Sequence, residues 1–144
     1  MATKKKIRFI INPISGHSRK AGLIKQINKF LDKEKFDPSI VYTEYGGHAC
    51  KLAKEAADEG IDIVVAVGGD GTINEVGRSL IHTDTALAII PYGSGNGLAR
   101  HLLIPLNAKK AIQIINECEI HTLDYGKING IPFFCTCGMG FDAL

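Results

Sequence analysis

The residues with the clearest chemistry lie together in one short stretch, Gly68-Gly69-Asp70-Gly71-Thr72. A carboxylate and a hydroxyl among glycines are typical of a turn that a phosphate group approaches closely, because glycine leaves backbone N–H groups accessible. Asp70 is therefore a candidate to hold a metal ion beside phosphates or to accept a proton. The alternative is a tight turn with a capping Asp and no ligand. These residues alone leave both interpretations open.

A buried strand and an amphipathic helix are expected on either side of this turn. The β-branched run Ile63–Val67 predicts a strand covered on both faces, as in parallel sheets. Beyond the glycines, apolar residues recur at the spacing of one helix face, namely Ile73, Val76, Gly77 and Leu80. We expect Thr72 to cap this helix or to bond a phosphate oxygen, and Glu75 to complete a capping box. The turn then lies at a strand's carboxyl end and a helix N-terminus, where anions bind.

A second glycine turn, Gly93-Ser94-Gly95-Asn96, follows another apolar run, Ala86–Ile90. A helix is expected to begin near Asn96, whose side chain can bond ribose or phosphate. Two such turns at one sheet edge would clamp a polyphosphate. Gly93, Gly95 and Gly97 alternate as G-x-G-x-G, a spacing that does not match the dinucleotide fingerprint, and the sequence has no Walker A motif.

The remaining elements alternate between strand and helix patterns. Strands are expected at Ile7–Asn12 and Ser39–Tyr42. Further helices are expected from residue 23 to about residues 33–35, from residue 49 until Gly60 stops the helix, and over residues 108–116. This order predicts an α/β fold, a doubly wound and mainly parallel sheet with flanking helices. The helix pattern ends before residue 120, where the pattern of a hairpin begins.

The C-terminal part predicts a hairpin of two strands, Ile120–Ile128 and Ile131–Cys137, joined by Asn129-Gly130. We therefore expect residues 1–118 to form a nucleotide-binding domain and residues 119–144 to form a hairpin leading into a truncated, β-rich second domain. An unpaired edge and an apolar surface on this hairpin would favour self-association into a homo-oligomer.

Composition excludes several classes of protein. The 144 residues are 45% hydrophobic, enough for one compact domain, and the net charge of +2 does not indicate nucleic-acid binding. The cluster Lys4, Lys5, Lys6 and Arg8 is interpreted as a solvated terminus, with attraction to anionic lipid headgroups as the alternative. No membrane-spanning run or signal peptide is evident, so we expect a cytoplasmic location. The four cysteines show no paired CxxC spacing and are expected to be free thiols.

Three blocks in fixed order carry a resemblance to a known family. They are Asn12-Pro13-Ile14-Ser15-Gly16, Gly68–Thr72 followed by Asn74-Glu75-Val76, and the run Pro91–Arg100, PYGSGNGLAR. Together they resemble the diacylglycerol kinase catalytic domain family, whose superfamily includes sphingosine kinases and NAD kinases. The resemblance runs from about Lys5 to the last residue and implies a Rossmann-like, three-layer fold.

This resemblance implies a site for ATP and Mg²⁺, with Asp70 as the catalytic carboxylate and the magnesium ligand. The nucleotide-binding residues that it implies are Asn12, Ser15, Gly16, Thr43, Gly68, Gly69, Asp70, Gly71, Thr72, Glu75, Gly93, Ser94, Gly95 and Asn96. Thr43 corresponds to a position near the adenine pocket. Gly97 stands where many family members carry an acidic residue, which removes any lipid or metal contact expected of that side chain.

The function implied is that of a lipid kinase in phospholipid biosynthesis, which moves the γ-phosphoryl group of Mg²⁺-ATP to a diacylglycerol-like hydroxyl. The lipid partner would be met at the inner face of the membrane through the second domain, with no nucleic-acid partner. Two alternatives remain. The chain as given is a nucleotide-binding module that catalyses nothing by itself, or the enzyme is a NAD kinase, which shares the GGDGT block.

Overall fold

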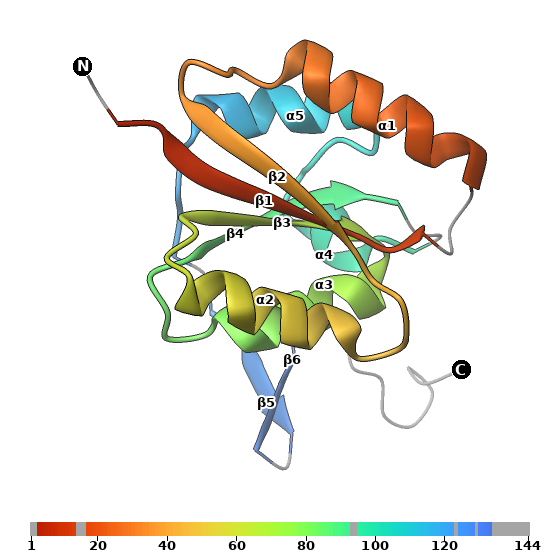
Figure 1. Ribbon diagram of the computed structural model, residues 1–144. Coiled ribbons are helices and arrows are strands. Elements are labelled where there is room, and N and C mark those ends of the chain that lie inside the picture. The colour runs from red at the N-terminus through yellow and green to blue at the C-terminus, as the bar shows by residue number, and fades with distance from the viewer. Residues whose placement is uncertain (1–2, 14–16, 93–94, 123, 129, 134–144) are drawn as a thin grey trace.

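The computed structural model describes residues 3–13, 17–92, 95–122, 124–128 and 130–133. Its centre is a sheet of four parallel strands in the order β2-β1-β3-β4 (Figure 1). The strands are β1 (Lys5–Ile11), β2 (Phe36–Tyr42), β3 (Ile63–Gly68) and β4 (Ala86–Pro91). The predicted α/β class with a parallel sheet and flanking helices is confirmed.

Helices cover both faces of the sheet, as Figure 1 shows. One layer consists of α1 (His17–Phe30) and α5 (Ala108–Glu117), which pack on each other. The other layer contains α2 (His48–Asp58), α3 (Asp70–Leu80) and the short α4 (Gly97–His101). Because successive strand residues point to opposite faces, β3 supplies Val65 and Val67 to the first layer and Val64 and Ala66 to the second. This two-sided burial explains the uninterrupted apolar run of β3.

The strand order places a topological switch between β1 and β3. The chain passes from β1 outward to β2, then crosses back over β1 to form β3 on its other side. In open α/β sheets, ligands bind outside the carboxyl ends of the strands at such a switch. The loop after β1 and the glycine turn after β3 both start at this point.

Several expected boundaries were wrong, since β1 begins at Lys5 rather than Ile7 and α1 ends at Phe30 rather than near residues 33–35. Strand β2 begins at Phe36 rather than Ser39 and includes Pro38, which pairs in register with Ile7. An edge strand tolerates proline because one side of its backbone has no partner strand. In the hairpin, β5 covers Gly126–Ile128 and pairs antiparallel with β6, Ile131–Phe133. The described residues between 120 and 125 do not form the expected strand, and residues 134–137 lie outside the described ranges.

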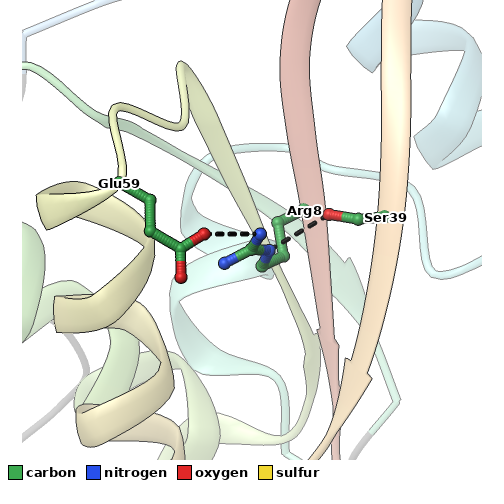
Figure 2. Close-up of polar contacts among 3 residues, drawn as sticks. All are labelled: Arg8, Ser39 and Glu59. Atoms are coloured by element: carbon green, nitrogen blue, oxygen red, sulfur yellow. Dashed lines mark hydrogen bonds and ion pairs between the residues drawn. The ribbon is translucent and has the colours of Figure 1, made fainter.

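The lysines of the N-terminal cluster are exposed, but the interpretation of Arg8 as a solvated residue was wrong. Its side chain is 18% exposed and lies between β2 and the end of α2 (Figure 2). Arg8 Nη2 lies 2.8 Å from Glu59 Oε2, and Arg8 Nε donates a hydrogen bond to Ser39 Oγ at 3.0 Å. Arg8 therefore joins three elements at the amino-terminal side of the sheet.

Two further expectations concern the membrane and the cysteines. None of the helices in the described part of the chain is long and apolar enough to cross a membrane. Cys50 and Cys118 are free thiols, as expected, and Cys135 and Cys137 fall outside the described ranges.

Candidate functional site

Backbone hydrogen bonds hold the carboxyl ends of the four strands level with one another. Beyond the strands, Thr43 N–H donates to Ile11 O at 3.0 Å and Asn12 N–H donates to Val67 O at 3.1 Å. On the far side, Tyr92 N–H donates to Gly68 O at 2.8 Å. The segments that leave the four strands therefore start along one edge, which we call the carboxyl edge. Thr43, 8% exposed, is the candidate residue at its β2 end.

The first glycine turn contains fewer residues than expected before the helix starts. Gly69, in an extended conformation, is the N-cap of α3 and makes no side-chain cap, so the helix begins at Asp70. Thr72 lies inside the first turn rather than capping it, and its Oγ1 accepts a hydrogen bond from Asn12 Nδ2 at 3.4 Å. This contact joins the residue after β1 to the helix after β3, across the switch point. The two side chains that the sequence placed in separate blocks thus meet.

The capping box expected of Glu75 was also wrong. Glu75 Oε1 accepts a hydrogen bond from Gly47 N–H at 3.2 Å, at the start of α2. Gly47 occupies the left-handed region with φ of 89°, which favours glycine there. Glu75 therefore ties α3 to the loop that precedes α2.

Two glycines of the turn differ in what surrounds them. A Cβ added to Gly68 would lie 2.8 Å from Thr72 Oγ1 and 2.9 Å from Thr72 Cβ, so packing alone requires glycine at this position. A Cβ on Gly71 would meet nothing within 4 Å. Gly71 is exposed in the first turn of α3, where the backbone N–H groups have no partners within the helix. Open space at Gly71 is compatible with a ligand approaching this helix start.

Asp70 connects the two glycine turns. Its Oδ1 accepts a hydrogen bond from Gly97 N–H, the first residue of α4, at 2.7 Å. A Cβ on Gly95 would lie 3.0 Å from Asp70 Oδ2, so the second turn passes close to the carboxylate. Asn96, the N-cap of α4, is 5% exposed and adopts the left-handed conformation with φ of 55°, which asparagine tolerates better than most residues. A negative charge thus lies between two helix N-termini.

The structure brings Asn12, Thr72, Gly68, Asp70 and Gly95 to the carboxyl edge. The predicted site residues Ser15, Gly16, Gly93 and Ser94 lie outside the described residues. The contribution of the Gly97 backbone N–H could not be predicted from the sequence. Every residue except proline has such a donor, and its acceptor, Asp70, lies 27 positions away.

Among the described residues, the carboxyl edge offers one carboxylate, Asp70, as a ligand for Mg²⁺, so most ligands of a bound ion would have to come from a substrate and water. Within the described ranges, no group of three or more His, Cys, Asp or Glu residues could hold a metal ion. Mg²⁺ is commonly bound by one or two carboxylates together with substrate phosphates and water. Asp70 fits as the protein ligand of an ion held mainly by a nucleotide.

Comparisons with known proteins agree with this architecture. The chain is 36% identical over 140 residues to a diacylglycerol kinase of Bacillus subtilis (strain 168), covering 94% of this chain and 46% of that protein. A diacylglycerol kinase of Staphylococcus saprophyticus is 34% identical over 132 residues, covering 90% of this chain and 43% of the relative. The chain therefore spans less than half the length of the curated relatives that it matches.

A solved structure and a family model extend the match to the fold and the motifs. The crystal structure of a diacylglycerol kinase from Bacillus anthracis str. Sterne superposes with a TM-score of 0.78 at 30% identity, over 92% of this chain and 46% of that one. The family model described as the diacylglycerol kinase catalytic domain matches residues 6–128, a range that includes both glycine turns. The chain belongs to the diacylglycerol kinase catalytic domain family.

Proposed function

We propose that this chain is the nucleotide-binding part of an ATP-dependent lipid kinase, which transfers the γ-phosphoryl group of ATP to the hydroxyl of a diacylglycerol-like lipid. The relatives named diacylglycerol kinase support the class of reaction. The observation that carries the proposal for this chain is the contact of Asp70 with Gly97 N–H, because it gathers a carboxylate and two glycine turns at one edge.

Phosphoryl transfer requires mainly positioning and neutralisation of charge. The start of α3, together with the described residues Gly95 and Asn96 of the second turn, would supply backbone N–H groups to hold the phosphates of the nucleotide. Asn12 and Thr72 form the floor between β1 and β3, and Thr43 would border the base at the β2 end. Mg²⁺, when bound with the nucleotide, supplies positive charge that offsets the charge of the phosphates.

Asp70 has two roles in the proposal. Its carboxylate would hold the ion beside the phosphates, or it would accept the proton that the lipid hydroxyl loses as its oxygen attacks the γ-phosphorus. Its bond to Gly97 N–H fixes the orientation of the carboxylate before the nucleotide arrives. Both roles require a negative charge at this position.

The test is calorimetric titration of this chain with ATP, with and without Mg²⁺, followed by a transfer assay on the full-length protein with diacylglycerol. We expect binding that depends on the metal. The variant Asp70→Asn keeps an oxygen that can accept the Gly97 N–H bond but loses the charge. Its metal-dependent binding should therefore disappear, and turnover of the full-length variant should fall by about 100-fold or more.

Asp62→Asn is the matched control, because Asp62 accepts a backbone bond from Lys6 N–H at 2.8 Å at the opposite end of the strands. It removes the same charge and should leave ATP binding and turnover unchanged. Normal turnover in Asp70→Asn would remove Asp70 from the mechanism. Transfer to NAD instead of the lipid would overturn the choice of acceptor.

A further inference from the structure

An apolar cavity lies against the outer edge of β4. Within the described residues, β4 pairs with β3 on one side and has no partner strand on the other. The cavity has a volume of about 770 Å³, which falls within the range of about 300–1,000 Å³ typical of small-molecule sites. None of the described nucleotide-binding candidates lines it. The cavity is therefore separate from the proposed ATP site.

Both helix layers and the segment after α5 enclose this cavity. Its wall consists mainly of aliphatic side chains from α3, β4, α4 and α5. Leu80 and Leu98 line it from one helix layer, and Ala111 and Ile115 line it from the other. Residues 118–122, which lead from α5 towards the hairpin, form a further wall (Figure 1). An apolar group in the cavity would be covered by aliphatic side chains on several sides.

Polar side chains line the part of the cavity that meets solvent. His82 precedes β4, and Tyr125 Oη lies 3.3 Å from His82 Nε2. Glu119 and His121 line the cavity from the segment after α5, and both are exposed, as is His82. Hydroxyl and imidazole groups can donate or accept hydrogen bonds. The cavity thus combines an apolar interior with hydrogen-bonding groups beside solvent.

The charge of the lining restricts the class of ligand. Among the described residues, the lining contains Glu117 and Glu119 but no lysine or arginine. A carboxylate or phosphate group would therefore meet negative charge without a permanent cation that offsets it. An uncharged hydroxyl group meets no such repulsion and can bond to His82, Thr83 or Tyr125. The lining favours a ligand with an apolar body and a neutral, hydroxyl-bearing head.

We propose that this cavity binds one neutral single-chain lipid, such as a monoacylglycerol or a long-chain alcohol. Its chain packs among the aliphatic side chains, and its hydroxyl head lies beside His82 and Tyr125. Binding at this site does not require the chain to be a kinase, because the cavity and the carboxyl edge use different residues. Apolar burial provides most of the affinity, and the polar groups fix the direction of the lipid.

Helix α4 connects the cavity to the proposed ATP site. Leu98 of α4 lines the cavity, and the preceding residue, Gly97, donates its N–H to Asp70. A lipid chain packed against Leu98 would hold α4 in place and, with it, the contact at Asp70. Occupancy should therefore raise the affinity for Mg²⁺-ATP by about fivefold or more. This effect, unlike the lipid site itself, rests on the proposed function.

The experiment is calorimetric titration of the chain with monooctanoylglycerol and monodecanoylglycerol, below the concentrations at which they aggregate. Two further buried CH₂ groups should raise the affinity about 15-fold, from about fourfold for each group. Decanoate has the same acyl chain as monodecanoylglycerol but a negatively charged head. It should bind about tenfold more weakly or less, because the lining carries negative charge.

Ile114→Gln tests the wall of the cavity. Ile114 lines the cavity from α5 and is 42% exposed, so a polar side chain is tolerated there. The affinity for monodecanoylglycerol should fall by about fourfold or more, the equivalent of at least one CH₂ group. The matched control is Leu106→Gln, because Leu106 is 46% exposed and does not line the cavity. This control should change the affinity less than twofold.

Several outcomes would overturn the inference. They are equal affinities for the octanoyl and decanoyl lipids, equal losses in the two glutamine variants, and binding of decanoate as tight as that of monodecanoylglycerol. Dimerisation in solution that Ile114→Gln abolishes would assign the cavity to a second copy of this chain instead.

Titration with Mg²⁺-ATP, with and without monodecanoylglycerol, separates this inference from the proposed function. An unchanged Mg²⁺-ATP affinity in the presence of bound lipid would reject the effect through α4. Mg²⁺-ATP binding without lipid binding would reject the lipid site alone. Lipid binding without Mg²⁺-ATP binding would reject the proposed kinase and leave the lipid site in place.

Discussion

Polar residues lie at both ends of the sheet, but their contacts differ between the two ends. At the amino edge, where the strands begin, polar side chains close the structure on itself. Thr85 Oγ1 donates to Ile61 O at 2.8 Å, Lys6 N–H donates to Asp62, and Arg8 bridges β2 and α2. At the carboxyl edge, the Asn12 side chain donates to the Thr72 side chain and Asp70 accepts from the Gly97 backbone N–H, and two helices start there.

This difference shows which polar contacts serve the fold and which are suited to a ligand. At the amino edge, larger side chains such as Arg8 reach across to neighbouring elements and leave their groups satisfied. At the carboxyl edge, glycine removes side-chain volume where backbone N–H groups have no partner within a helix. Substitutions at the amino edge should therefore alter stability alone, and substitutions at the carboxyl edge should alter ligand binding as well.

The largest effect on stability is expected from Gly68→Ala. The new Cβ would clash with Thr72 Oγ1 and Cβ, the latter close to the backbone and unable to move freely. The free energy of unfolding in urea should fall by about 1–3 kcal/mol, the range for overpacking. Mg²⁺-ATP affinity should fall with it, because Thr72 would be displaced.

Gly71→Ala is the control for that substitution. Gly71 lies three residues further along the chain, and a Cβ added there would meet nothing within 4 Å. Its stability should be unchanged or raised by up to about 1 kcal/mol, since alanine is the better helix former. Weaker Mg²⁺-ATP binding without loss of stability would place the phosphates against this backbone. Equal destabilisation by both alanines would contradict the packing argument.

An intermediate effect is expected from Arg8→Met at the amino edge. The variant keeps much of the apolar stem but loses the bonds to Glu59 and Ser39. Because the Glu59 side chain is 55% exposed and solvent screens the pair, the loss in unfolding free energy should be about 1–2 kcal/mol. Calorimetry should show unchanged Mg²⁺-ATP affinity, and a weakened affinity would show that the two edges are coupled.

The smallest effect is expected from Thr85→Val, which has nearly the same shape. It removes one buried hydroxyl donor from Ile61 O and should cost about 0.5–1 kcal/mol in a urea unfolding experiment. Nucleotide affinity should again stay the same. If Thr85→Val lowered the free energy of unfolding as much as Gly68→Ala does, the amino edge would depend mainly on this one hydrogen bond rather than on several contacts.

The sequence predicted the elements of this fold well where a single periodicity dominates. The apolar run of β3 and the helical spacing of Ile73, Val76 and Leu80 lie in the predicted elements, because buried residues must repeat with the period of the backbone. The start of β2 was missed because Pro38 normally ends a strand, and only its position at the edge of the sheet allows it.

The site was less predictable, because its geometry depends on contacts between distant residues. The glycine turns were located by residue type, but the roles of Thr72 and Glu75 as a capping box were wrong. Gly69 can begin the helix without a side-chain cap, and Glu75 has a backbone partner on another element, Gly47. The bond between Asp70 and Gly97 could not be read from either motif alone.

One long-range contact has a consequence for synthesis of the protein. Asn116 accepts a hydrogen bond from Asp32 N–H at 2.8 Å and donates one to Phe30 O at 2.7 Å, fastening the end of α1 to α5. During translation, α1 emerges early, but α5, which covers part of its apolar face, appears only when most of this chain has been made. A nascent chain that pauses before Asn116 would therefore leave the end of α1 without this attachment, and its folding would be completed only when α5 is available.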